Sequence, residues 1–277
     1  MRMCYVKMLA MVFTIAAFIG VNSLSAFAAA EPDWANKVIQ VTGMGAQPAN
    51  AVTPAQARML ARRAAVADAY RQLAESIKGV NVDAETTVEN MMVLSDTIKT
   101  KVNATIQGAV VVSEKEIPGG GYEVTMQVPI FGVQNSVASA VMTPSTDPTV
   151  PTVPETFPAP TVTVPSVGGY TGLIIDCRGL GLKPVMSPVI KNNSGVPIYG
   201  HKNLNPDKVI AQGMADYTYD TNTGIARAGS NPLIVKAVSI DGNLRGNPVV
   251  STEDANKILT ENNISHFLEN TNVVFVR

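Results

Sequence analysis

The chain has 277 residues, of which 16% are charged and 5% are aromatic, and its formal net charge is -1. This length is typical of two modest domains rather than one large core. The even balance of charge argues against a nucleic-acid or anionic-membrane binder, because both functions need clustered Lys and Arg. The scarcity of aromatic residues also argues against stacking platforms for bases or sugars.

The first 30 residues have the three parts of a secretory signal peptide. Arg2 and Lys7 supply the positive start, residues 8–21 form an apolar core, and small residues at 26–30 offer cleavage sites. A retained membrane anchor is the alternative, but the apolar run is short for a span. We therefore expect cleavage and export to the periplasm or the outer membrane. Cys4 precedes the apolar core, whereas a lipoprotein needs a cysteine directly after it, so we expect no lipid anchor.

A Pro-rich segment at residues 143–167 divides the remaining chain. Its prolines alternate with Thr and Val, and proline excludes a helix because it lacks the N–H donor and clashes with the preceding turn. As an extended spacer it would reach roughly 70 Å. We therefore expect two independently folded domains, residues 33–137 and residues 168–277, that the linker holds apart.

In the first domain, residues 37–47 alternate as a strand, and a long helix follows. Thr53 has the spacing of an N-cap to Gln56, and Gly79 ends the helix after about Lys78. We expect its apolar stripe to face a sheet; the stripe consists of Met59, Val66, Tyr70, Leu73 and Ile77.

Residues 84–107 fit a helix or a strand, and we favour a short helix near 86–92 and a strand from about 97. Residues 108–118 and 122–132 read as a hairpin joined by glycines 119–121. The first domain is thus expected to be one long helix on an antiparallel sheet of three or four strands.

The second domain also reads as α+β. We expect strands at 169–179, 231–242 and 272–277, a hairpin over 183–200, and a helix over 251–263 that Ser251 caps. The expected fold class is therefore α+β, with two small domains that each contain an antiparallel sheet with packed helices.

The first domain resembles a bacterial envelope family. A strand ending in Gly43 and Gly45, the "ARRAA" helix segment at 61–65, and the "YEVTM" hairpin strand at 122–126 carry the resemblance. It covers about residues 37–132 and points to the twenty-kilodalton lipoprotein family and the N-terminal domain of the flagellar assembly protein T. The resemblance implies an envelope structural protein, in the flagellar case a component of a ring around the basal body, and it brings no catalytic residues.

The sequence contains only weak patterns for catalytic or metal chemistry. Cys177 and His201, with Asp176 to orient them, are the only residues suited to a thiolate pair, and a single cysteine beside "LII" is typical of a core residue. Residues 220–224 resemble part of a calcium loop, but Gly224 and Asn231 occupy ligand positions. The glycines of residues 178–181 fit a turn better than a phosphate loop. We expect no metal, no cofactor and no intramolecular disulfide.

We therefore expect a non-enzymatic exported protein that contacts other envelope proteins, including flagellar basal-body components as one class, or copies of itself. Arg58, Arg62 and Arg63 are the candidate contact residues, although such a cluster is often a solvated helix face. The alternative is a periplasmic small-ligand-binding or hydrolytic protein with its site in the second domain, at Asp176, Cys177 and His201.

Overall fold

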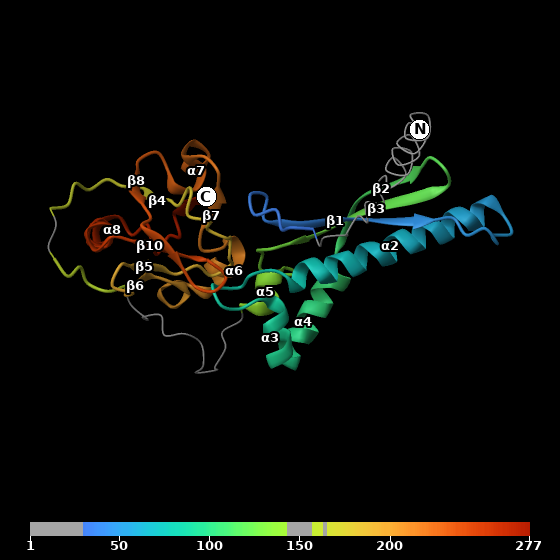
Figure 1. Cartoon of the computed structure of the whole chain (residues 1–277), viewed down its shortest axis with the longest axis horizontal. Helices are drawn as coiled ribbons and strands as arrows, with labels where there is room; N and C mark the ends of the chain where they lie inside the picture. Colours follow the sequence, from blue (N-terminus) through green and yellow to red (C-terminus); the bar gives the residue numbers. More distant parts are fainter. Residues whose placement is uncertain (1–29, 143–156, 163–164) are drawn as a thin grey trace, which may run out of the picture.

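The computed structural model describes residues 30–142, 157–162 and 165–277. The expected signal peptide, with its cleavage sites, and most of the Pro-rich segment lie outside the described residues. Within the described part, helices and strands form two domains in chain order (Figure 1). The two-domain α+β class is confirmed.

The first domain is built on a three-stranded antiparallel sheet with the order β1–β3–β2. Its strands are β1 (Val38–Ala46), β2 (Val110–Ile117) and β3 (Gly121–Pro129). Helix α2 (Pro54–Lys78) lies along one face of this sheet, as Figure 1 shows. The Thr53 side chain accepts a hydrogen bond from the Gln56 N–H, and Gly79 ends the helix, so both helix ends and the closing hairpin are as predicted.

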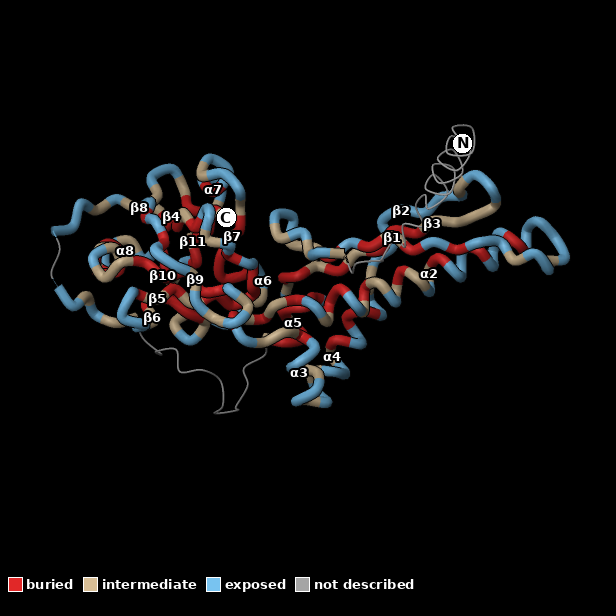
Figure 2. Tube along the Cα trace, viewed as in Figure 1, coloured by how far each residue is buried: buried red, intermediate tan, exposed pale blue. Residues whose placement is uncertain are grey.

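The contact between α2 and β1 depends on alanines and glycines. The buried row of α2 follows i, i+4 spacing through Ala61, Ala65 and Ala69. A Cβ on Gly43 would lie 2.2 Å from the Ala65 carbonyl oxygen, and one on Gly45 would lie 2.1 Å from that of Ala61. Glycine is therefore required where the strand meets the helix backbone. Figure 2 shows the buried band that runs between α2 and the sheet.

The stripe that we expected to face the sheet is wrong in its N-terminal half. Met59 is 67% exposed, and Val66 and Tyr70 are only half buried, whereas Leu73 and Ile77 are fully buried. The alanine row packs against the sheet instead, because small side chains let the backbones of α2 and β1 approach closely. Val66 and Tyr70 pack at the margin of the core together with residues of the next two helices.

The strand expected from about residue 97 is a helix. Residues 88–107 form α3 (Val88–Leu94) and α4 (Asp96–Gln107), and the Ser95 side chain caps α4 by accepting a hydrogen bond from the Ile98 N–H. The helical spacing of Val102 and Ile106 buries both against the core, which the competing two-residue alternation could not do here. A short helix, α5 (Val137–Val141), ends the domain.

Strand direction in the second domain differs from the expected antiparallel sheet. One of its sheets has the order β7–β11–β4–β8, and all neighbouring pairs in it are parallel. Its members are β4 (Gly172–Asp176), β7 (Asp216–Thr218), β8 (Pro232–Lys236) and β11 (Val273–Val276). Parallel strands need crossover connections. These contain α6 (Pro206–Gln212), α7 (Thr221–Ala228) and α8 (Thr252–Ser265), and our reading of the sequence missed the first two.

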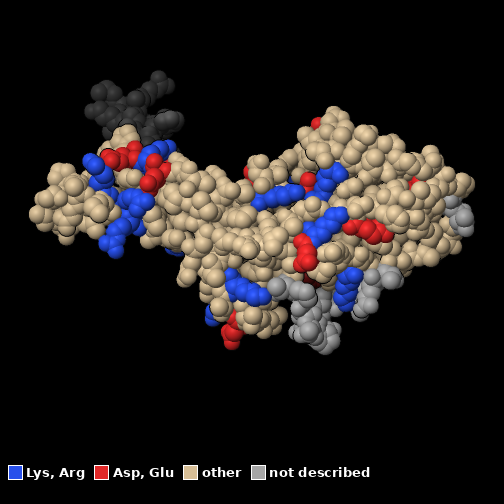
Figure 3. All heavy atoms as spheres, turned by 180° about the vertical axis from the view of Figure 1, so that it is seen from behind, with Lys and Arg blue, Asp and Glu red and all other residues tan. Residues whose placement is uncertain are grey.

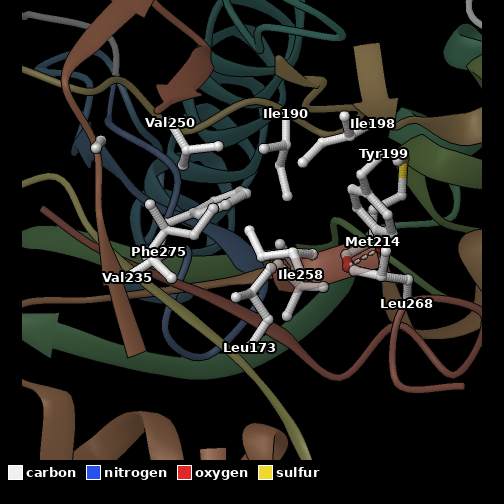
Figure 4. Close-up of a cluster of buried hydrophobic side chains, with 14 of the residues drawn as sticks. Leu173, Ile190, Ile198, Tyr199, Met214, Val235, Val250, Ile258, Leu268 and Phe275 are labelled. Atoms are coloured by element: carbon white, nitrogen blue, oxygen red, sulfur yellow. Dashed lines mark hydrogen bonds between the residues drawn. The ribbon is translucent and has the colours of Figure 1, made fainter. Parts of the chain in front are cut away.

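The second sheet of this domain has the order β6–β5–β10–β9. It contains β5 (Ile190–Asn192), β6 (Pro197–Tyr199), β9 (Ser239–Asp241) and β10 (Asn247–Val250), and the short 3-10 helix η1 (His201–Asn203) follows β6. The predicted hairpin is confirmed, but the strand expected over 231–242 is divided between two sheets. Figure 4 shows the core that both sheets share, where Leu173 and Phe275 lie with Ile190, Tyr199 and Ile258.

The described end of the Pro-rich segment is docked onto α8. The Asn256 side-chain oxygen accepts hydrogen bonds from the Thr161 N–H at 2.9 Å and from its hydroxyl at 3.1 Å. Glu261, which is 1% exposed, accepts three more, from the Ser166 hydroxyl and from the N–H groups of Val167 and Gly168. We call residues 157–162 and 165–168 the strap, because buried polar groups fix it to the second domain.

The two domains touch directly, so the expectation that the linker holds them apart is wrong. The Asn81–Ala84 loop of the first domain accepts three backbone hydrogen bonds from the second domain, donated by Met186, Ser187 and Leu244. Met186 is 1% exposed and belongs to the core of the first domain. Trp34 lies edge-on to Tyr217, with ring centroids 5.6 Å apart. Apolar contacts of this kind hold the two domains together, however long the segment that connects them is.

Among the described residues, no helix combines the length and the apolar character needed to cross a membrane.

Candidate interaction surface

Arg58 and Arg62 bind acidic residues of the neighbouring strand. The Arg58 guanidinium lies 2.9 Å from the Glu116 carboxylate, and that of Arg62 lies 2.7 Å from Glu114. The hydrogen bond from Arg62 to Glu114 and the opposite charge raise the pKa of the arginine. These pairs fasten α2 to β2, and both are too exposed to contribute much to stability.

Arg63 is placed differently from the other two arginines. It is exposed on α2, and within the described residues it forms no ion pair. The structure therefore does not join the three predicted contact residues into one basic patch. Figure 3 shows Lys and Arg interspersed with Asp and Glu around the end of the first domain that is remote from the second.

The outer edge of β1 is covered by side chains of α2. Asp68 accepts a hydrogen bond from the Met44 N–H at 3.0 Å, and the Gln72 amide donates to the Thr42 carbonyl at 3.1 Å. Gln72 also donates to Asp68 at 2.8 Å, and Arg71 donates to Asp68 at 2.8 Å, so the covering group is itself held. These bonds satisfy backbone groups that another strand would otherwise pair with.

Asp68 is held in its charged form by the same contacts. Burial alone would raise the pKa of Asp68, but the hydrogen bonds from Arg71, the Met44 N–H and Gln72 together outweigh it and lower that pKa. The β1 edge is therefore closed at neutral pH.

The outer edge of β2 has no such cover. All of its residues from Val110 to Glu116 are exposed, and among the described residues no side chain hydrogen-bonds to its backbone. Val110, Val111 and Val112 are exposed by 59%, 41% and 49%. An exposed apolar edge with unpaired backbone groups is a template for another strand. We call this feature the open edge.

The comparisons with known proteins give a match for each domain. Residues 32–129 match the LPP20 lipoprotein family. The N-terminal domain is a member of the LPP20 lipoprotein family. Residues 172–277 match the family described as the second domain of Treponema pallidum Tp0624. No curated protein matches the chain.

The LPP20 assignment agrees with the resemblance inferred from Gly43, Gly45 and the alanine helix. The match suggests an exported, lipoprotein-like protein of the cell envelope, and the family has no known catalytic role. In the structure, the two glycines and the alanine row are the two sides of one close helix–strand contact in the LPP20 domain.

In the Tp0624-type domain, the alternative thiolate site is not assembled. Cys177 is fully buried with its sulfur directed to the Ile175 carbonyl, and burial raises the pKa of its thiol to about 12. His201 instead lies 3.4 Å from the Ser187 hydroxyl, and burial lowers its pKa. Asp176 pairs with Arg178 at 2.6 Å, which lowers the pKa of Asp176 to about 2.

The remaining sequence motifs are structural. Asp220 caps α7 by accepting a hydrogen bond from the Asn222 N–H, so residues 220–224 begin a helix. Residues 178–181 form a turn in which Gly179 and Gly181 have positive φ. His266 is the left-handed C-cap of α8. Among the described residues, no group of three His, Cys, Asp or Glu side chains is placed to hold a metal ion.

The open edge was not singled out from the sequence. The run "AVVVSEKE" at 109–116 was recognised as a strand, but a strand does not tell which edge of a sheet it will occupy. One signal was present: three consecutive valines break the apolar–polar alternation of a half-buried strand, which suggests side chains on both faces without a covering helix. The role of Asp68 and Gln72 could be found only in three dimensions.

Proposed function

We propose that this protein is a non-catalytic assembly module of the cell envelope, and that it acts by pairing its open edge with a strand of a partner. The observation that supports this most is the difference between the two edges of one sheet. Asp68 and Gln72 cover the edge at β1, while β2 exposes three valines and its backbone. Covering one edge and leaving the other without a covering side chain is what strand addition by a partner requires.

The direct contact between the domains supports the same proposal. Because the Tp0624-type domain is docked on the Asn81–Ala84 loop, it fixes the base of the LPP20 domain, and the open edge is presented from a rigid support. Binding by strand addition then costs little ordering of the protein. Arg63, which is exposed on α2, would supply a further, basic contact to the partner.

The cellular setting is part of the proposal. The protein is exported through a cleaved signal peptide and acts in the periplasm or at the outer membrane. The resemblance of the LPP20 domain to the N-terminal domain of flagellar assembly protein T favours a basal-body ring as one setting, and general envelope maintenance or secretion support is the other.

A crosslinked pull-down of the tagged protein from its own cells tests the proposal. The wild type is compared with Val111→Lys, which places a charge on the open edge, and with Val52→Lys, a matched change at an exposed valine away from it. We expect the wild type and Val52→Lys to recover the same envelope proteins or copies of the chain, and Val111→Lys to lose most of them. Equal recovery by all three variants would contradict the proposal. Flagellar ring proteins among the losses would select the motility setting.

A second candidate function, ligand binding by the Tp0624-type domain, has one observation in its favour. The carboxyl ends of parallel strands are a frequent place for ligands. Here they bring Asp176 and Lys236 opposite each other, with Arg277 directly after β11. Thermal-shift screening of small anions, with Lys236→Ala as the control, tests this function; no shift with any anion in the wild type would exclude it.

A further inference from the structure

We propose that the open edge pairs with the open edge of a second copy of this chain, antiparallel about Val111. This rests on the proposed function and names its partner. The pairing would join two LPP20 domains into one six-stranded sheet.

The sequence of the edge is self-complementary about Val111. Residues 109–113 read Ala-Val-Val-Val-Ser, a small residue on each side of three valines. A two-fold axis through Val111 sets this residue against its own copy and Val110 against Val112. The pairing ends with these valines, because a bulge between Val111 and Ser113 sets Ser113 opposite Thr125 and turns its backbone groups toward β3. Cross-strand pairs of β-branched residues stabilise a sheet, so each copy supplies the strand that the other needs.

Charge selects this register over the others. The side chains of directly opposed residues lie on the same face of a sheet. The two-fold axis therefore has to pass through a residue that pairs with its own copy. An axis through Glu114 would set that carboxylate against its copy, and one through Ser113 would set Val110 and Val112 against glutamates. Opposed like charges are destabilising. The register about Val111 is the one in which all three valines oppose valines, and it keeps the charges outside.

The ion pairs of β2 remove the remaining electrostatic repulsion between the two copies. Glu114 and Glu116 lie just beyond the valines, and both are already neutralised by arginines of α2. Lys115 pairs with Glu123 on the other face of the sheet, at 3.0 Å. Two copies can therefore approach without bringing together uncompensated carboxylates.

The backbone of Val111 is available for this pairing. The backbone groups of Thr42 and Met44 point away from β3, because they bind side chains of α2. Backbone groups alternate in direction along a strand, so Gly43 hydrogen-bonds to Val124 of β3. By the same alternation, the backbone groups of Met126 also point toward β1 and not toward β2. Val111 lies opposite Met126 and therefore points its N–H and C=O outward. Two hydrogen bonds between the Val111 residues of the copies can form.

The covered edge of β1 limits the assembly to two copies. In a six-stranded sheet the two outer strands would both be β1, and their edges are closed by Asp68 and Gln72. The contact is isologous, so it forms a closed dimer rather than a filament. Both α2 helices then lie on the same face of the joined sheet.

Disulfide trapping tests the register. The full chain carries Cys4→Ser, so that the remaining native thiol is Cys177, which is buried. Directly opposed residues have Cα atoms about 5.5 Å apart, within the range of a disulfide. We expect Val111→Cys to form a covalent dimer under mild oxidation at least tenfold faster than Val52→Cys or Val93→Cys, which are exposed by 85% and 81%. Adding Val112→Lys to Val111→Cys should remove most of this dimer.

Equal rates for Val111→Cys and the two control cysteines would overturn the pairing. If that result comes with capture of a different envelope protein that Val111→Lys loses, the proposed function stands and the second copy is wrong. If neither a dimer nor a captured protein depends on Val111, both the function and the pairing fail.

Discussion

Gly45 of β1 lies against the backbone of Ala61 in α2, and a Cβ placed on this glycine would be 2.1 Å from the Ala61 carbonyl oxygen. The same hypothetical atom would lie 2.5 Å from the Ala65 nitrogen, so neither side can yield without moving the helix. The glycine pattern of β1 therefore allows the long helix to pack closely on the sheet of the LPP20 domain.

Gly45→Ala should therefore destabilise the first domain by about 3 kcal/mol, because overpacking a rigid contact forces backbone shifts. Chemical unfolding followed by circular dichroism measures this. Gly79→Ala is the matched control, since its Cβ would meet nothing closer than 3.6 Å, and we expect a change of less than about 1 kcal/mol. Similar losses in the two variants would show that the close approach is not needed.

Asp68→Ala should open the second edge of the sheet. The Met44 N–H loses its acceptor, and its hydrogen exchange at neutral pH should become roughly tenfold faster, as expected for a lost hydrogen bond to a charged group. Glu75→Ala is the control, because Glu75 shares Arg71 with Asp68 but makes no bond to β1. Unchanged exchange at Met44 in Asp68→Ala would contradict the closed-edge account.

The sign of the pH dependence follows from the lowered pKa of Asp68. A carboxyl group whose folded pKa lies below its ordinary value of 3.8 contributes its full stability at neutral pH and loses it as the pH falls through the folded pKa. Acid titration of the wild type should open the β1 edge only below about pH 3.8, and Asp68→Asn should show no such step.

Glu261→Gln should release the strap. The amide of Gln can offer only one oxygen to three donors, so we expect a loss of about 2 kcal/mol and faster proteolysis within residues 157–168. Burial alone would raise the pKa of Glu261, but the bonds from Val167, Ser166 and Gly168 lower it, so the wild-type strap should hold at neutral pH and loosen in acid. The exposed Glu253→Gln on the same helix is the control.

Met186→Ala should uncouple the two domains. Met186 comes from the second domain but fills the core of the first, and its truncation should cost about 3 kcal/mol. Calorimetry should show one unfolding transition for the wild type and two for the variant. Met59→Ala, at an exposed methionine, should leave the single transition intact. Two transitions in the wild type would mean that the interface does not couple the domains.

Local signals in the sequence were sufficient for much of the first domain. Thr53 and Gly79 bound α2 correctly because caps act within a few residues. Local signals failed where tertiary contacts determine the structure. Met59 is exposed because the alanine row of α2 packs against the sheet, and residues 96–107 are helical because Val102 and Ile106 are buried together in the core. The parallel sheet was missed because α6 and α7 are short, with seven and eight residues, and carry weak patterns.

The candidate surface was less accessible to sequence reasoning. Arg58 and Arg62 were chosen for their charge, but their glutamate partners lie more than fifty residues away on β2. The open edge follows from strand order, which residues 109–116 do not encode on their own. The closed edge of β1 depends on side chains of α2 that hydrogen-bond to the backbone of this strand.

Photo-crosslinking in intact cells shows which edge of the sheet meets a partner. A photoreactive amino acid replaces Val112 on the open edge or Gln40 on the opposite edge strand, both of which are exposed. We expect a defined crosslinked product, to an envelope protein or to a second copy, at Val112 and none at Gln40. No product at Val112, or equal products at both positions, would contradict the claim that β2 is the contact edge of this protein.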